Sequence, residues 1–325
     1  MQEFTFPIID LHCDLLLYLA IIPDAQIDAT QDIGVTLPYL KAGNVRQQTV
    51  AVFGKTDRHS VDWGAKQLAQ YEQLLQREEF YAYTALSDQQ EQGIGLTLAI
   101  ENASILALEE EPVEKVFSRL ERYLAVGKRL FYITLTHHTE NRFGGGNYST
   151  VGLKPDGERL LEYMAGHNIP VDLSHTSDAL AEDILNYIVQ HNLQLPVLAS
   201  HSNFRSLRDH PRNLTNEIVQ EIVHRKGLIG ANFLRLFLNG ERSESLLEHI
   251  EFGLAHAPDT MAFGADFFYR PAISAPERQP LFFTEYEDAG QYPKILRQLR
   301  ERGTEEAALH RLASENVRRF TQRVW

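Results

Sequence analysis

The chain has 325 residues, 43% of them hydrophobic and 23% charged, which is enough apolar material for one large barrel or two smaller domains. Its 31 basic and 44 acidic residues give a formal net charge of −13, which argues against binding to nucleic acid or to anionic membrane surfaces. One cysteine excludes an internal disulfide, and the sequence has neither a secretory signal nor an apolar run of the ~20 residues that a membrane helix needs. We therefore expect a soluble, cytoplasmic protein.

Eight short strand-like runs recur along the chain, and stretches with helical periodicity separate them. The runs lie at residues 7–12, 49–53, 96–101, 130–137, 170–175, 196–201, 228–233 and 261–266. Between them, helices are predicted over 112–126, which opens at a proline and stops at Gly127, and over 216–226, which follows a Thr215 cap. Strands that alternate with helices favour an α/β fold of the (β/α)8 TIM-barrel type. An open dinucleotide-binding sheet is disfavoured because no glycine-rich turn follows the first strand.

The end of the chain departs from this alternation. Residues 267–288 are rich in proline and aromatic residues without clear periodicity, so we expect a long loop near the barrel mouth. Two helices are predicted within 289–325. Nothing resembles a linker or a repeat array, and a single catalytic barrel domain over 1–325 is the simplest interpretation.

Ionisable residues collect at the carboxyl ends of the predicted strands, where barrels of this type place catalytic groups. They are His12 with Asp14, Glu101, His137, His175, His201 and Asp266. Imidazoles and carboxylates are the ligands that borderline divalent metals prefer. Since one barrel end gathers all these positions, the sequence predicts a shared metal site.

The stretch "DLHCD" shows how such a site is built. In an extended backbone, residues two apart face the same side, so His12 and Asp14 can reach one ion while Cys13 points the other way. Cys13 is then a small buried residue rather than a nucleophile. Taken alone, His-x-Asp also fits a polar strand end with a capped turn.

Each remaining candidate has an ordinary structural alternative. His175 and His201 could be buried histidines satisfied by a hydrogen-bond partner, and Glu101 could form a salt bridge with a nearby Arg or Lys. By strand alternation His138 should face away from His137. The glycine-rich segment 141–150 lacks the Lys-Ser/Thr pair of a phosphate loop and is expected to be a mobile loop beside the site.

The order and spacing of seven short motifs between residues 8 and 266 resemble those of the membrane dipeptidase (renal dipeptidase) family, peptidase family M19. The motifs are "DLHCD", "AIEN", "LTH", "DLSH", "SHSNFR", "HPRN" and "GADF". Members of this family are binuclear zinc hydrolases on a metal-dependent-hydrolase barrel. The resemblance therefore implies a (β/α)8 fold and a dipeptidase activity.

The resemblance also implies individual roles. His12 and Asp14 would hold one zinc, His175 and His201 the other, and Glu101 would bridge both. His137 would contact the substrate near the scissile carbonyl and Asp266 would transfer protons. Arg212, in "HPRN", would bind the substrate carboxylate, although outside the family context it could be a surface arginine paired with an acid.

Two departures from the family pattern lie beside these residues. Asn102 and Ala103 follow Glu101, where the family usually has glycine, and Phe268 and Tyr269 follow "GADF", where many members have Asp-Gly. No metal ligand is lost, so hydrolysis is expected to persist. The substrate preference is left open.

The expected chemistry is hydrolysis of a dipeptide by a hydroxide that bridges two divalent ions. The metals are expected to be Zn²⁺, although manganese and cobalt suit the same ligands. The family often tolerates a D-residue at the C-terminal position, and its members often form homodimers. Hydrolysis of a cyclic amide or lactam is the alternative reaction, and a non-catalytic metal-binding barrel is the alternative class of function.

Overall fold

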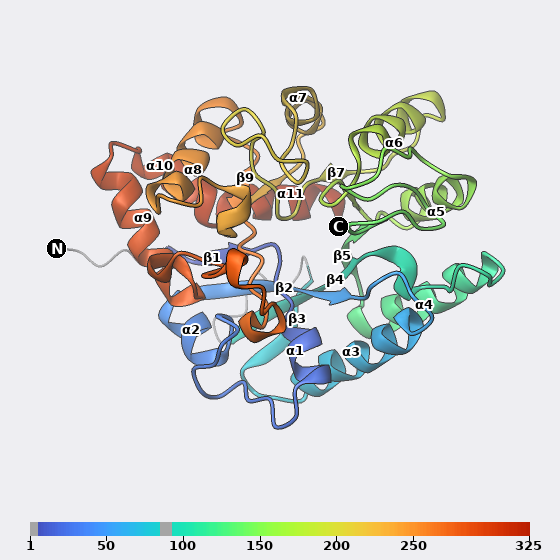
Figure 1. Cartoon of the computed structure of the whole chain (residues 1–325), viewed down its shortest axis with the longest axis horizontal. Coiled ribbons are helices and arrows are strands. Elements are labelled where there is room, and N and C mark those ends of the chain that lie inside the picture. The colour runs from blue at the N-terminus through green and yellow to red at the C-terminus, as the bar shows by residue number, and fades with distance from the viewer. Residues whose placement is uncertain (1–5, 85–92) are drawn as a thin grey trace.

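The computed structural model describes residues 6–84 and 93–325. At its centre is a parallel barrel of eight strands, which lie in the middle of the molecule with helices around them (Figure 1). Its strands are β1 (Ile8–Asp10), β2 (Val45–Phe53), β4 (Ile94–Glu101), β5 (Leu130–Thr134), β6 (Val171–Asp172), β7 (Val197–Leu198), β8 (Ile229–Ala231) and β9 (Met261–Phe263). They pair in the order β7-β6-β5-β4-β2-β1-β9-β8, and a bridge between Ala199 and Ile229 joins the two ends. The predicted (β/α)8 fold is confirmed.

The helices follow the strands along the chain. They are α1 (Leu15–Ile21), α2 (Leu37–Ala42), α3 (Ser60–Leu74), α4 (Glu114–Gly127), α5 (Pro155–Gly166), α6 (Asp178–Gln190), α7 (Asn216–His224), α8 (Glu244–His256), α9 (Tyr292–Glu301), α10 (Glu306–His310) and α11 (Asn316–Val324). The predicted helices at 112–126 and 216–226 correspond to α4 and α7. The hydroxyl of Thr215 caps α7 as expected, accepting a hydrogen bond from the amide of Ile218.

Six of the eight barrel strands end two or three residues earlier than their apolar runs predict, and only β2 and β4 end where expected. Strands β5, β6 and β7 stop at Thr134, Asp172 and Leu198, so the histidines that follow them lie in loops rather than on strands. The cause is visible at Asp172, whose Oδ1 accepts hydrogen bonds from the amides of Ser174 and Ser200. A side chain replaces strand pairing there, and the backbone is free to turn.

One further strand lies outside the barrel order. β3 (Phe80–Ala82) pairs with β4 in parallel and was not predicted. It is three residues long and only its first residue is buried, which is too little for an alternating pattern to reveal.

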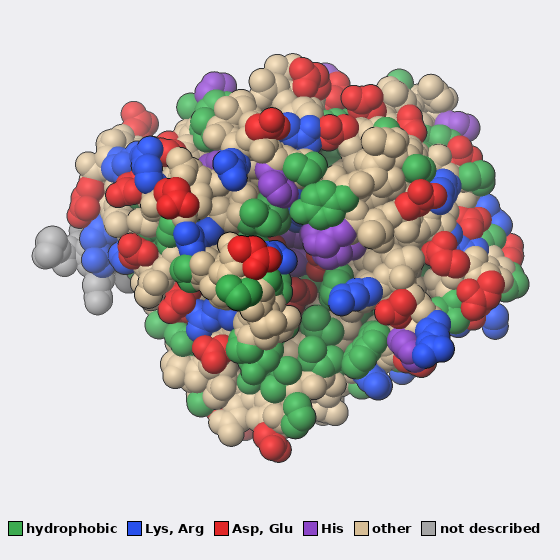
Figure 2. All heavy atoms as spheres, viewed as in Figure 1, with side chains coloured by type: hydrophobic (Ala, Val, Ile, Leu, Met, Phe, Trp, Pro, Cys, Tyr) green, Lys and Arg blue, Asp and Glu red, His purple; other side chains and the backbone are tan. Residues whose placement is uncertain are grey.

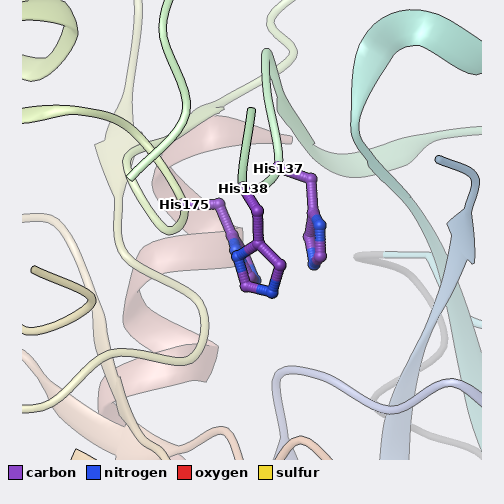
Figure 3. Close-up of side chains that lie close together, drawn as sticks. All are labelled: His137, His138 and His175. Atoms are coloured by element: carbon purple, nitrogen blue, oxygen red, sulfur yellow. The ribbon is translucent and has the colours of Figure 1, made fainter. Parts of the chain in front are cut away.

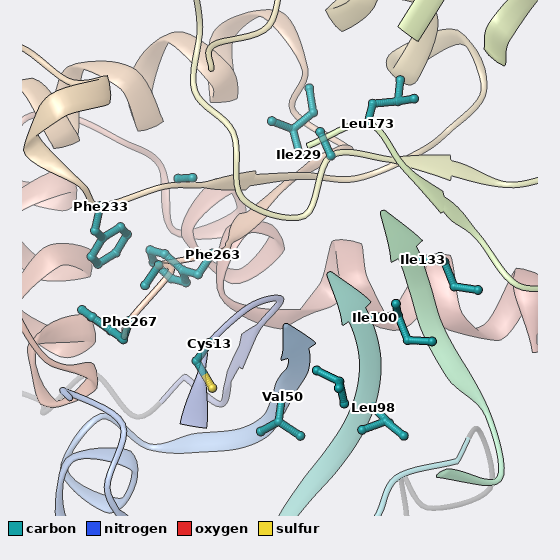
Figure 4. Packing of buried hydrophobic residues seen from close by; sticks show 14 of the residues in the cluster. Cys13, Val50, Leu98, Ile100, Ile133, Leu173, Ile229, Phe233, Phe263 and Phe267 are labelled. Carbon is teal, nitrogen blue, oxygen red and sulfur yellow. The ribbon is translucent and has the colours of Figure 1, made fainter. Parts of the chain in front are cut away.

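The apolar core has two parts. The larger part contains Cys13, which lies buried among core side chains such as Val50 and Leu98 (Figure 4). The smaller part joins strand residues such as Ile9 and Phe131 to Val317, Phe320 and Val324 of α11. The expectation that Cys13 is a buried core residue is confirmed, and the C-terminal helix packs on the barrel.

Residues 267–288 contain three single-turn 3₁₀ helices, at Arg270–Ala272, Pro276–Arg278 and Thr284–Tyr286, and no α-helix. After α9 and α10, a π-helical turn at Arg311–Glu315 leads into α11. Asn316 ties this turn to β9 by donating a hydrogen bond from Nδ2 to the carbonyl oxygen of Met261. Among the described residues, no helix is both long and apolar enough to cross a bilayer.

Candidate metal centre

Loops at the carboxyl ends of the barrel strands bring the predicted ligands together around Glu101. The Oε1 atom of Glu101 lies 3.0 Å from Nε2 of His175 and 3.6 Å from Nε2 of His201. Its Oε2 atom lies 3.4 Å from Nε2 of His12. One carboxylate therefore faces imidazoles from three different loops, as a shared ligand requires.

The two aspartates complete the cluster. Potential ligand atoms of His12, Asp14 and Glu101 lie within 4.8 Å of one another, and so do those of His12, His201 and Asp266. Asp14 is the residue that precedes α1, but its side chain makes no capping hydrogen bond. The alternative of a capped turn therefore does not account for Asp14.

Several ligand atoms in this cluster have no partner in the protein. Among the described residues, Nε2 of His12, Nε2 of His201 and Oδ1 of Asp14 are buried without a hydrogen bond. Buried polar atoms are nearly always paired, so three such atoms in one place indicate a missing binding partner. Divalent cations fit this donor set, since imidazole nitrogen and carboxylate oxygen are their usual ligands.

Hydrogen bonds on the opposite ring nitrogens orient two of the histidines. The hydroxyl of Tyr132 donates to the carbonyl of Leu11, so its oxygen accepts from Nδ1 of His12 at 2.6 Å. A proton on Nδ1 leaves the Nε2 lone pair free for a metal.

The same arrangement recurs at His201. The hydroxyl of Ser200 donates to Oδ2 of Asp172 at 2.5 Å and accepts from Nδ1 of His201 at 2.6 Å. Tyr132, Ser200 and Asp172 were not singled out from the sequence, because buried tyrosines and serines in apolar runs look like ordinary core residues.

Burial sets the charge state of the site. It raises the pKa of Glu101 to about 8 against the opposing effect of the Arg212 charge, and it raises the pKa of Asp266 to about 7 despite nearby His12. Burial also lowers the pKa values of His175 and His201 well below their usual range, so both rings are neutral at pH 7. The imidazoles are therefore neutral, and the carboxylates resist ionisation because no positive charge nearby is large enough to stabilise their anions. Both properties are expected of a site that binds metal cations.

Three residues of the site have left-handed backbones. Asn102, His175 and Asp266 have φ values of 71°, 64° and 64°. At Asn102 the side chain also donates from Nδ2 to the carbonyl of Gly54 at 2.7 Å and accepts from Ser104. Asparagine tolerates this backbone better than most residues, which explains how it can stand where the family usually has glycine.

The expectation for His138 was wrong. Strand β5 ends before this residue, and the His138 ring lies next to His137, with ring centroids 3.8 Å apart. Both side chains line one cavity of the molecule. Figure 3 shows the rings of His137, His138 and His175 close together. Oδ1 of Asn147 accepts from Nδ1 of both His138 and His175, at 3.0 and 3.2 Å.

Asn147 belongs to the glycine-rich segment 141–150, which the structure places beside the site. Contrary to the mobile loop expected, its backbone is tied down. The amides of Asn147 and Tyr148 donate to the carbonyls of His137 and His138. At Gly146 a Cβ atom would lie 2.2 Å from the carbonyl oxygen of His137, so glycine is needed for this close approach.

Arg212 is not a surface residue, since it is 3% exposed. Its guanidinium donates from Nη1 to Ser202 and from Nη2 to the carbonyl of His201, both at 3.1 Å. Within the described part of the chain its Nε has no hydrogen-bond partner. Burial lowers its pKa, and the charges of Asp266 and Glu101 oppose that effect. Arg212 does not line the cavity that His137 and His138 line.

A cavity of about 630 Å³ opens onto this cluster. Asp14, Glu101, His137, His175 and Asp266 line it on the side of the cluster. Figure 2 shows a hollow near the middle of this face of the molecule, with histidine and acidic side chains inside it and hydrophobic side chains gathered below it. Its volume is within the range of small-molecule sites.

Comparisons with known proteins bear on the family and the fold of the chain. A family model described as "Membrane dipeptidase (Peptidase family M19)" matches residues 3–325. A solved metallopeptidase from Rhodobacter sphaeroides, liganded with a phosphinate mimic of the dipeptide L-Ala-D-Ala, superposes with a TM-score of 0.83 at 20% identity, covering 99% of this chain and 100% of that one. At this identity the likeness shows a shared fold.

Curated relatives are similar over part of their length. An uncharacterized dipeptidase of Schizosaccharomyces pombe is 26% identical over 218 residues, which cover 64% of this chain and 48% of that protein. Dipeptidase tcpJ of Claviceps purpurea is 24% identical over 202 residues, covering 59% of this chain and 44% of that protein. The chain thus spans about half the length of these curated relatives.

Proposed function

Because the chain belongs to the membrane dipeptidase family, peptidase family M19, we propose that it is a metal-dependent hydrolase of dipeptides. The observation that carries this proposal is the position of Glu101, between His12 on one side and His175 and His201 on the other. Unpartnered ligand atoms on His12, His201 and Asp14 support it.

In this proposal the site holds two divalent cations, preferably Zn²⁺. His12 and Asp14 would hold one, His175 and His201 the other, and Glu101 would be shared. Such a pair supplies Lewis acidity when bound, because it polarises a peptide carbonyl and lowers the pKa of water toward neutrality. The neutral state of His175 and His201 at pH 7 suits this role.

The remaining side chains would handle protons and the carbonyl oxygen. Asp266 would take the proton from the attacking water on its carboxylate and deliver it to the nitrogen of the leaving amine. Its amide partner Asn232, which donates from Nδ2 to Oδ2 at 2.9 Å, would keep Oδ1 pointed at the site. His137 lines the cavity, where its Nε2 could donate to the developing oxyanion.

Arg212 would recognise the carboxylate of the C-terminal residue. A guanidinium presents donors in a planar fork, and the unpartnered Nε of Arg212 leaves one of them unused. Lys55 and Arg278 add positive charge on the cavity wall, and Asp57 adds one further carboxylate. These groups match the charged ends of a free dipeptide better than an internal peptide bond.

A panel of dipeptides tests the proposal. The protein is loaded with zinc, its metal content is measured, and release of free amino acids is followed for L,L and L,D pairs. We expect cleavage of several members, including some with a D-residue in second position, as the ligand of the Rhodobacter sphaeroides enzyme suggests. No cleavage of any dipeptide with two metals bound per chain would refute the proposal.

A cyclic amide or lactam is the second candidate substrate. Phe268 and Tyr269, which stand where many members have Asp-Gly, line the cavity and make it suitable for a ring. Fast opening of a lactam together with weak turnover of all dipeptides would favour this reaction over the first.

A further inference from the structure

We propose that the cavity selects dipeptides that carry a large apolar side chain, and that α1 together with residues 268–273 forms the surface that selects them. The inference rests on the proposed dipeptidase function and deepens it. The selecting surface, called the apolar wall below, consists of Leu17, Tyr18, Ile21, Phe268, Tyr269, Ala272 and Ile273.

The composition of the cavity is the first argument. Outside the candidate metal centre, only three of the residues that line the cavity are charged, namely Lys55, Asp57 and Arg278. Phe53, Trp63, Leu234 and Phe237 continue the apolar surface away from the wall. Most of the surface that a substrate would touch therefore offers contact to a hydrocarbon or aromatic group and no hydrogen bond.

The size of the cavity is the second argument. Its volume of about 630 Å³ leaves space beside a substrate with two methyl side chains. A small substrate buries little of this apolar surface and therefore gains little binding energy from it. Each additional methylene buried in such a pocket raises kcat/KM by about tenfold or more. A bulky side chain should therefore be strongly preferred.

The wall is also held in place before a substrate arrives. The rings of Tyr18 and Tyr269 lie 5.3 Å apart between centroids, and those of Phe268 and Phe282 lie 5.5 Å apart. The hydroxyl of Tyr18 accepts a hydrogen bond from the amide of Gln26.

Arg270 fixes the segment next to these rings. Its guanidinium pairs with Asp32 at 3.0 Å and with Glu287 at 2.8 Å, while its amide donates to the carbonyl of Asp32. A surface fixed in this way loses little conformational entropy on binding, which favours discrimination between side chains.

The departure from the family pattern gives the wall its character. Phe268 and Tyr269 follow Asp266 closely in the chain, so the residues that replace Asp-Gly extend from the proton-transfer residue along the cavity. A polar residue and a glycine would leave this position open and hydrated. Two aromatic rings make it apolar.

The test compares kcat/KM for Ala-Ala, Phe-Ala, Ala-Phe and their counterparts with a D-residue in second position, using the zinc-loaded enzyme. We expect at least one phenylalanine-containing dipeptide to exceed Ala-Ala by about tenfold or more. Tyr269→Ala should reduce that ratio severalfold, and Ile21→Ala tests the same wall from α1. Tyr269→Phe should retain the ratio, because the ring and not the hydroxyl forms the surface.

Tyr187→Ala is the matched control, since this partly exposed tyrosine lies on α6 and does not line the cavity. It should leave the ratio unchanged, and metal content and thermal unfolding confirm that each variant is folded and loaded. Equal turnover of Ala-Ala and the larger dipeptides, or a ratio unaffected by both Tyr269→Ala and Ile21→Ala, overturns this inference alone. Failure to cleave any dipeptide would instead overturn the proposed function.

Discussion

Two groups of buried carboxylates lie close together in this barrel and differ in how they are satisfied. Asp10 accepts hydrogen bonds from the amides of His12 and Ala265, the side chain of Gln48 and the hydroxyl of Tyr292. Asp172 likewise accepts four hydrogen bonds, from Thr134, from the amide of Ser174, and from the amide and hydroxyl of Ser200.

Two carboxylates of the candidate metal centre, Asp14 and Glu101, have no such donors among the described residues, whereas Asp266 accepts one hydrogen bond, from Nδ2 of Asn232. Oδ1 of Asp14 is buried and unpartnered within the described residues, and Glu101 faces the Nε2 atoms of four histidines at 3.0 to 3.7 Å. Glu101 is buried, as Asp10 and Asp172 are, so burial alone does not identify a site. The absence of protein donors around Asp14 and Glu101 does, because their lone pairs require a partner from outside the chain.

Substitution of the central ligand should have the largest effect. Glu101→Gln keeps the shape of the side chain but removes the shared negative charge, so we expect the metal to be lost. We expect kcat/KM to fall by more than about 100-fold, because the loss of a residue that only supports a metal ligand already lowers activity by up to about 100-fold. Metal analysis and dipeptide turnover measure this. The metal-free variant should be no less stable than the metal-free parent at pH 8, and a strongly destabilised variant would mean that Glu101 has a structural role.

Arg212 resembles the residues of the candidate metal centre in one respect, because its buried Nε has no hydrogen-bond partner among the described residues. We expect this side chain to bind the substrate carboxylate. Arg212→Ala should weaken binding of dipeptides with a free carboxylate by about 2 to 5 kcal/mol, seen in KM, because a desolvated charge pair is lost. C-terminal amides of the same dipeptides serve as the control and should lose much less. An equal loss for acids and amides would contradict a carboxylate-binding role.

Asp10 should behave in the opposite way to Glu101. In Asp10→Asn an amide group faces donors that need an acceptor, so we expect the free energy of unfolding to fall by about 3 kcal/mol in urea titrations. The folded fraction should still bind its full complement of metal. Loss of metal without loss of stability would mean that Asp10 belongs to the metal site and does not differ in role from Glu101.

The stability of the metal-free protein should depend on pH. Burial raises the pKa of Glu101 to about 8 and that of Asp266 to about 7, so the folded state keeps protons that the unfolded chain releases near pH 4. Six histidines have pKa values that burial lowers, and in the unfolded chain they lose their protons around pH 6.5, so they add little slope above about pH 7.5. Above about pH 7.5 the folded state therefore binds more protons than the unfolded state.

Stability should consequently fall by about 1 kcal/mol as the pH rises from about 7.5 to about 9. Urea unfolding in the presence of a chelator, at these two pH values, measures the fall. Addition of zinc should abolish it, since the cations stabilise the ionised carboxylates. A metal-free protein that becomes more stable with rising pH would contradict the electrostatics described here.

Residues that orient the ligands should show the smallest effects. Tyr132→Phe and Ser200→Ala remove the acceptors of Nδ1 of His12 and His201, and we expect metal affinity to fall by about 10- to 100-fold while folding persists. Competition with a metal-sensitive dye measures the affinity. Thr321→Val, which removes a buried hydroxyl in α11 far along the chain from the ligands, is the control and should leave metal affinity unchanged.

The sequence was sufficient to predict the barrel and most of the residues that lie together at its mouth. Apolar runs that end in His12, Glu101, His175 and His201 indicate both where the strands lie and which side chains meet at the barrel mouth. They do so because the carboxyl ends of all strands lie at one end of a parallel barrel. Motif order then indicated the family. This information is local, because each motif spans only a few residues. The barrel geometry then brings the motifs together in space.

Other features depended on contacts between distant segments. The sequence could not reveal that β5 ends early enough to turn His138 into the cavity, or that Asn147 would reach two histidines from the glycine-rich segment. Tyr132 orients His12 from a position 120 residues away in the chain. The apolar wall joins α1 to residues 268–273, and neither segment is a pocket by itself. Tertiary structure decides these features because loop conformation and side-chain partners follow from packing between segments, which no local pattern records.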